Sequence, residues 1–138
     1  MITNAFQDMK LSALGMGNMR LPVVDGNDAV IDEAATEAIL DYCMTHGINY
    51  YDTAWGYHSG NSELVVGKLL QKYPRESFYL ASKFPGYDLS NMGRVEEIFE
   101  QQLQKCRVGC RACEQVCPQQ IHIPDALADF AARVGQKG

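Results

Sequence analysis

The residues most able to do chemistry are a group of cysteines late in the sequence. Four of the five cysteines lie within one short run, namely Cys106, Cys110, Cys113 and Cys117. The bacterial [4Fe–4S] run is Cys-x₂-Cys-x₂-Cys-x₃-Cys-Pro, in which thiolates bind the iron atoms. The last three cysteines and Pro118 match that run, but Arg107 stands where the first cysteine belongs and Cys106 comes one residue early. The spacing therefore predicts a cluster held by three cysteines, with Cys106 as a candidate fourth ligand.

Two other interpretations of these cysteines stay open. Cys106 also ends the apolar stripe of a predicted helix, where a cysteine usually packs as a small apolar side chain. Four thiols would equally suit a tetrahedral zinc site, which tolerates irregular spacing. Cys43 lies on a different predicted helix and is expected in the core. Cysteines grouped in this way are typical of a metal or cluster site in a reducing compartment, so we expect a cytoplasmic protein.

Length and charge exclude several classes of partner. A chain of 138 residues is expected to form one folded core. Its formal net charge of −5, with 12 lysines and arginines, leaves no basic stripe to follow a phosphate backbone, so we expect no nucleic acid partner. No stretch approaches the roughly 20 apolar residues that span a bilayer, so no membrane association is expected.

The elements that must position any site are units in which a strand precedes a helix. Short apolar runs alternate with amphipathic stretches up to about residue 108, which favours an α/β fold with a parallel sheet. A first strand and its loop are expected over residues 11–22, and further strands over residues 48–54 and 78–84. The first helix is expected over residues 32–46, with Asp32 as its N-cap and Gly47 just past its end. Asn61 and Ser62 are expected to cap a second helix that runs to about Lys72.

A third helix is predicted over residues 94–106, just before the cysteine run. Its apolar stripe consists of Val95, Ile98, Phe99, Leu103 and Cys106. The residues expected to face away are Glu96, Glu97, Glu100, Gln101, Gln104 and Lys105. The composition then changes, and a short helix with Pro124 in its first turn follows the cysteines. We therefore divide the chain into residues 1–108 and a ferredoxin-like iron–sulfur tail, residues 109–138.

Residues 49–70 and 82–84 resemble the aldo/keto reductases. The resemblance rests on Asp52-Thr-Ala at a strand end, Tyr57 five residues later, Ser62-Glu63 and a glycine opening the next helix, and Lys83 ending the third strand. It covers roughly residues 8–108. The tail is similar to the iron–sulfur extension that one bacterial branch of this family carries, and this similarity implies a possible electron-transfer partner.

The family fold is a (β/α)₈ barrel of the TIM type, which takes about 250 residues. This sequence supplies three such units before the tail, so the resemblance implies a partial barrel with an internal deletion near residue 108. The extra residue between Cys106 and Cys110 would then mark the join. Three parallel strands cut from a barrel leave two unpaired edges, and we expect self-association through them.

The resemblance also implies roles for individual residues. In the family NADPH delivers hydride to a small carbonyl substrate while a tyrosine, here Tyr57, protonates the oxygen. A free phenol has a pKa near ~10, so this transfer needs an adjacent cation, here Lys83, which Asp52 holds in place. Gly17 and Asn18 after the first strand are the candidates to contact the nicotinamide.

The sequence departs from the family pattern at the catalytic histidine, which has no counterpart. His58 and His46 are expected to be solvated or locally hydrogen-bonded. The loops that bind the cofactor's phosphates are also missing. We therefore expect impaired reductase activity, and the alternative is a catalytically silent fragment that binds a cluster or zinc.

Overall fold

A computed structural model describes residues 1–105, and the cysteine-rich tail lies outside the described residues. Its elements follow the chain in the order β1 (Thr3–Phe6), β2 (Met9–Ser12), β3 (Met16–Gly17), α1 (Glu33–Thr45), β4 (Tyr50–Asp52), the 3₁₀ helix η1 (Tyr57–Gly60), α2 (Ser62–Leu70), the 3₁₀ helix η2 (Arg75–Ser77), β5 (Tyr79–Ala81), the 3₁₀ helix η3 (Leu89–Arg94) and α3 (Val95–Lys105). Each of β3, β4 and β5 is thus followed by a helix, as the sequence predicts.

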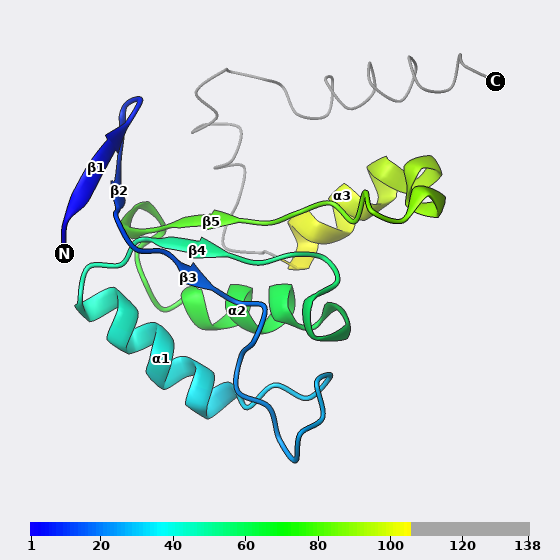
Figure 1. Ribbon diagram of the computed structural model, residues 1–138, viewed down its shortest axis with the longest axis horizontal. Coiled ribbons are helices and arrows are strands. Elements are labelled where there is room, and N and C mark those ends of the chain that lie inside the picture. The colour runs from blue at the N-terminus through cyan, green and yellow to red at the C-terminus, as the bar shows by residue number, and fades with distance from the viewer. Residues whose placement is uncertain (106–138) are drawn as a thin grey trace.

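The central sheet is parallel, with the order β3-β4-β5. Asp52 at the end of β4 stands opposite Gly17 on one side and Ala81 on the other. Helices α1 and α2 cover the same face of this sheet (Figure 1). The strands are much shorter than the apolar runs from which they were predicted. Because the strands are parallel, their carboxyl ends meet at one edge of the sheet, where α/β barrels place their active sites.

The core lies between this sheet and the two helices. Tyr51 in the middle strand is fully buried and belongs to one apolar cluster with Leu40 of α1 and Leu70 of α2. Its ring meets Phe78 edge-on, with the ring centroids 6.2 Å apart, and its hydroxyl donates a hydrogen bond to the Ile48 carbonyl at 3.1 Å. Burial raises the pKa of the Tyr51 phenol. Cys43 is buried in the same cluster, as expected.

An antiparallel hairpin of β1 and β2 precedes the parallel sheet, and the sequence did not reveal it. Asn49 ties the hairpin to the start of β4, because its side chain accepts a hydrogen bond from the Ser12 amide and donates one to the Lys10 carbonyl, both at 2.8 Å. Residues of the hairpin and of the sheet line an apolar cleft of about 320 Å³, which is formed by Phe6, Met9, Leu11, Tyr50 and Tyr79.

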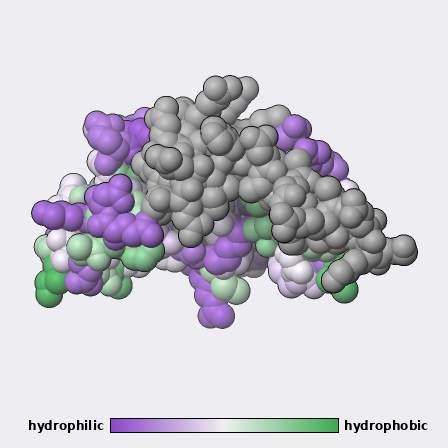
Figure 2. Space-filling view, turned by 90° about the horizontal axis from the view of Figure 1, so that it is seen from above, coloured by the Kyte–Doolittle hydropathy of each residue, from purple (hydrophilic) through white to green (hydrophobic). Residues whose placement is uncertain are grey.

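The edge strands β3 and β5 each pair with β4 alone among the described residues. Hydrophobic patches are visible at both ends of the molecule (Figure 2), and the exposed hydrophobic residues include Ile2 and Phe6 of the hairpin region and Leu89 of η3. Unpaired strand edges favour association with other chains. Self-association through these edges stays a prediction.

The ends of α1 and α2 test the capping residues that the sequence predicts. The Asp32 carboxylate accepts a hydrogen bond from the Ala35 amide at 3.0 Å, and Gly47 has a φ of +80°, so both predicted ends of α1 are confirmed. Asn61 is the N-cap residue of α2, as predicted, but its side chain makes no capping hydrogen bond, and the helix ends at Leu70, two residues before the predicted end. The Asn61 side chain instead donates to the Ala29 carbonyl, and the Ser62 hydroxyl donates to the Asn18 carbonyl. Bonds to a distant loop replace the local cap.

The α1 cap gives a prediction about stability. Replacing Asp32 by alanine should lower the free energy of unfolding by about 1 kcal/mol, because an amide of the first turn loses its acceptor. Urea denaturation of the full chain, followed by circular dichroism, measures this change. The Asp32→Asn variant keeps a side-chain oxygen at the cap and should stay close to the unmodified protein. Equal losses in the two variants would show that the carboxylate stabilises the fold in some other way.

Candidate active site

The three residues expected to act together do meet at the carboxyl edge of the sheet. The Lys83 ammonium forms an ion pair with the Asp52 carboxylate and donates hydrogen bonds to the Tyr57 hydroxyl at 3.2 Å and to the Thr53 carbonyl at 2.9 Å. Asp52 ends β4, and Lys83 comes just after β5, its direct neighbour. Parallel pairing of adjacent strands therefore brings the two side chains together.

Backbone hydrogen bonds continue beyond the strands and fix this meeting point. The Thr53 amide donates to the Ala81 carbonyl at 2.8 Å, and the Trp55 amide donates to the Lys83 carbonyl at 3.2 Å. The chain then turns into η1, where Tyr57 lies half-buried. The Lys83 ammonium lies 4.9 Å from the centroid of the Tyr57 ring. The position of the phenol is thus set by the loop that follows β4.

The electrostatics of the site keep Lys83 charged. Partial burial lowers the pKa of Lys83, but the hydrogen bonds and charge of Asp52 and Tyr57 outweigh it, so that the pKa of this ammonium is raised. The side chain is 49% exposed and solvent screens the pair, so the effect on stability is small. A cation held beside a phenol hydroxyl favours release of its proton. The arrangement can therefore deliver a proton from the Tyr57 oxygen.

The two residues expected to contact a nicotinamide differ in their accessibility. Gly17 is exposed, and a Cβ atom built on it would meet nothing within 4 Å. Asn18 is fully buried, and its side-chain amide donates to the carbonyls of Asp52 at 2.8 Å and Met16 at 3.3 Å. Asn18 thus fastens β3 to β4, whereas Gly17 faces open space. Contact of either residue with a cofactor stays a prediction.

A buried polar network behind Lys83 was missed from the sequence. The Glu63 carboxylate on α2 is 1% exposed, and it accepts hydrogen bonds from Ser82 and, at 2.6 Å, from the Gln102 amide. The Gln102 amide also contacts the Lys83 carbonyl at 3.2 Å. Gln102 lies seven residues after Val95, on the buried face of α3. This helical spacing is the sequence signal from which the burial of Gln102 could have been predicted.

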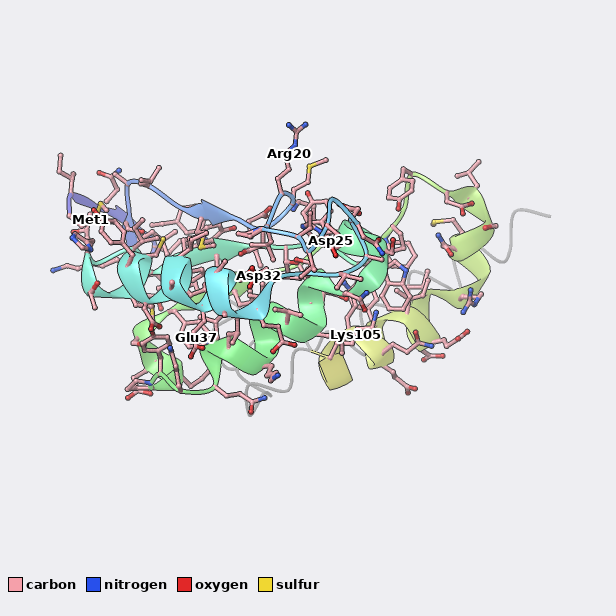
Figure 3. The ribbon with its side chains drawn as sticks, turned by 90° about the horizontal axis from the view of Figure 1, so that it is seen from below. Met1, Arg20, Asp25, Asp32, Glu37 and Lys105 are labelled. Carbon is pink, nitrogen blue, oxygen red and sulfur yellow. The ribbon has the colours of Figure 1, made fainter. Side chains whose placement is uncertain are left out.

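Lys105 was expected to face away from the protein, and this expectation is wrong. Its ammonium lies 3.9 Å from the centroid of the Trp55 ring, 3.5 Å from the Gly60 carbonyl and 3.8 Å from the Glu63 carboxylate. Figure 3 labels Lys105 at the end of α3. A cleft of about 380 Å³ lies here, lined by Trp55, Gly56, Ser59, Gly60, Pro85, Tyr87, Asp88, Asn91 and Lys105. The end of α3 lies near the loop after β4, so Lys105 contacts the Glu63 carboxylate and the Trp55 ring.

The two histidines of the described residues behave differently. His46 is exposed and contacts the Tyr42 carbonyl at 2.8 Å, as expected for a locally bonded side chain. The expectation for His58 is wrong, because the residue is only 3% exposed and its ring bonds to Leu21 and Asp28, far away in the sequence. Its position next to Tyr57 gave no hint of these long-range contacts.

The candidate metal ligands Cys106, Cys110, Cys113 and Cys117 lie outside the described residues. Within residues 1–105, no cluster of three or more histidine, cysteine or acidic side chains is arranged to hold a metal ion. Across the same range, no helix has the length and apolar character to cross a membrane.

Comparisons with known proteins agree on one family. The sequence is 37% identical over 79 residues to the NADH-specific methylglyoxal reductase of Escherichia coli strain K12. The matched segment covers 55% of this chain and 23% of that protein. The structure resembles the holo form of an aldo-keto reductase from Bacillus halodurans, with a TM-score of 0.55 and 29% identity, over 72% of this chain and 34% of that one.

An aldo-keto reductase from Klebsiella pneumoniae, solved in complex with NADPH, shares the fold with a TM-score of 0.54 at 24% identity, over 71% of this chain and 32% of that one. This chain spans less than a quarter of the length of curated relatives, from 22% to 24%. The described part is therefore an open portion of the barrel that these proteins form. The model of the aldo/keto reductase family matches residues 13–129, most of the sequence, and the chain belongs to that family.

Proposed function

We propose that this chain carries the proton-donating part of a NADPH-dependent carbonyl reductase. The supporting observation is the contact of the Lys83 ammonium with both the Asp52 carboxylate and the Tyr57 hydroxyl. A small aldehyde or ketone is the proposed substrate. Tyr57 gives its proton to the carbonyl oxygen as the carbonyl carbon is reduced, which yields an alcohol. Lys83 stabilises the phenolate that this leaves, until water returns the proton.

A nicotinamide, when bound, supplies the hydride for this reduction. Gly17 and Asn18, together with Asp52, are the residues proposed to hold it, because Gly17 stands opposite Asp52 at the carboxyl edge of the sheet and has free space beside it. We further propose that an internal deletion has removed later barrel units, including the catalytic histidine. The loss would weaken both cofactor binding and turnover.

Cofactor binding tests this proposal directly. NADPH titrated against the full chain, followed by its fluorescence, should bind weakly and saturably. The Gly17→Val variant should weaken binding about tenfold or more, since the side chain fills the proposed space. Gly93→Val is the matched control, because Gly93 in η3 also has nothing within 4 Å of an added Cβ and lies outside the site. Binding that is absent, or equal in all three proteins, would favour the silent fragment.

The missing units should limit catalysis. We expect NADPH-dependent reduction of a generic aldehyde to be at least ~100-fold slower than in an intact family member, because positioning and electrostatic groups each typically contribute factors of that order. Any turnover that belongs to this chain should disappear in Tyr57→Phe. Turnover near the level of an intact enzyme that depends on Tyr57 would contradict the proposed impairment.

The charge of Lys83 gives a further prediction. Because its pKa in the folded chain lies above the ordinary value, the ion pair adds stability below the ordinary pKa and loses it as the pH rises through the folded-state pKa. Asp52→Asn should lower the pKa of Lys83, as measured by NMR of the side chain. Glu96→Gln, an exposed position on α3, should leave that pKa unchanged. An unchanged value in Asp52→Asn would remove Asp52 from the proposed role.

We propose a [4Fe–4S] cluster as a second property of the chain, and only the cysteine spacing supports it. Anaerobic reconstitution should give a brown protein, and serine at Cys110, Cys113 or Cys117 should abolish the iron content. Serine at Cys106 should reduce it less, since that residue also fits an apolar helix stripe. Full occupancy in Cys106→Ser would make this residue a packing residue. Co-purified zinc in place of iron would indicate the zinc site and end the electron-transfer proposal.

A further inference from the structure

His58 follows Tyr57 directly but plays no part in the proton transfer described above. Its side chain is 1% exposed. The ring nitrogen Nε2 accepts a hydrogen bond from the Leu21 amide at 3.0 Å. The other ring nitrogen, Nδ1, lies 2.9 Å from the Asp28 carbonyl and 3.2 Å from the Asp28 carboxylate. Both partners belong to the loop between β3 and α1, so the ring bridges two separate loops.

These contacts define the protonation state of the ring. A backbone amide can only donate, so Nε2 must be unprotonated where it meets Leu21. Nδ1 then carries the proton and donates it to the Asp28 carbonyl. In the described part of the chain, the charged group against the ring is the Asp28 carboxylate, which is 73% exposed. The geometry therefore requires the neutral imidazole with its proton on Nδ1.

The backbone around His58 is strained. His58 has a φ of +53° and Ser59 a φ of +56°, which is left-handed conformation in residues other than glycine. This conformation is unfavourable for such residues, and it persists where surrounding contacts hold it. The two bonds of the imidazole supply such contacts immediately after Tyr57. Contacts with the β3–α1 loop thus hold the turn that orients the Tyr57 phenol.

Two more side chains cross between the same loops. Asn61 donates to the Ala29 carbonyl at 2.8 Å, and Ser62 donates to the Asn18 carbonyl at 3.0 Å. The loop that follows β3 begins at Asn18, next to the proposed nicotinamide contact Gly17. One loop therefore begins next to the proposed cofactor contact, and the other carries Tyr57.

We infer that His58 is a positioning residue, which as the Nδ1-protonated tautomer clamps the β3–α1 loop to the turn that bears Tyr57. The role rests on the proposed function, because it matters only if Tyr57 must face a cofactor held near Gly17. Loss of the clamp would free the left-handed turn, and the Tyr57 hydroxyl would leave the Lys83 ammonium.

The unmodified full chain tests the tautomer first. Nitrogen-15 NMR of the histidine rings at neutral pH should show a protonated Nδ1 and an unprotonated Nε2 for His58. A proton on Nε2 would overturn the inference, because the Leu21 amide would then have no acceptor. This measurement needs neither cofactor nor activity, so its failure is distinct from failure of the proposed function.

Variants then test the clamp. His58→Phe keeps a flat ring without hydrogen bonds, and it should speed hydrogen exchange of the Leu21 amide on the order of tenfold, while the Val66 amide in the core of α2 stays protected. His58→Gln keeps an acceptor and should restore part of the protection. His46→Phe, at an exposed position, is the matched control and should change neither amide.

The pKa of Lys83 separates positioning from a merely structural role. The Tyr57 hydroxyl contributes to the raised pKa of that lysine, so a freed Tyr57 should lower the pKa in His58→Phe and leave it unchanged in His46→Phe. An unchanged Lys83 pKa together with a protected Leu21 amide in folded His58→Phe would overturn the inference. If His58→Phe does not fold, His58→Gln and the tautomer measurement decide it.

Discussion

Parallel pairing of β4 with both neighbours is the constraint on which the rest of this structure depends. It places Asp52 opposite Gly17 and beside the strand that leads to Lys83. No local feature of the loops could bring residues 17, 52 and 83 to one point, since they are separated by helices. The fully buried Tyr51, on the opposite face of β4, fixes the strand against α1 and α2. The same strand thus anchors the core on one face and begins the site at its end.

Two carboxylates near Lys83 serve different purposes because their surroundings differ. Asp52 is partly exposed and pairs directly with the lysine, so water screens the interaction. Glu63 is buried and bonded to Ser82 and Gln102, with Lys105 at 3.8 Å. A buried charge needs such partners to offset desolvation. Glu63 therefore links α2 to the end of β5 and to α3.

The sequence predicted features that are carried by short-range patterns. The Asp32 cap and Gly47 depend on neighbouring residues alone, and the meeting of Asp52, Tyr57 and Lys83 followed from a family motif. His58, Gln102 and Lys105 were missed or misplaced because their partners lie about 20 to 45 residues away, at positions set by the packing of whole elements. A polar residue on an apolar helix stripe, as Gln102 is, was the one local sign available. Strand lengths were overestimated because apolar runs continue into loops that also lie in the core.

The contacts that organise the candidate site lie within the three βα units that the structure describes. Lys83 contacts Asp52, Tyr57 and Gln102, and Gln102 in turn contacts Glu63. His58 links the turn that bears Tyr57 to the loop after β3. The proton-donating geometry therefore does not require further barrel units to form. Cofactor affinity is a separate question, because the contacts proposed for the described residues involve the nicotinamide end alone. Under the proposed function, such a chain would keep the proposed acid, Tyr57, in place while lacking much of what would hold a hydride donor against it.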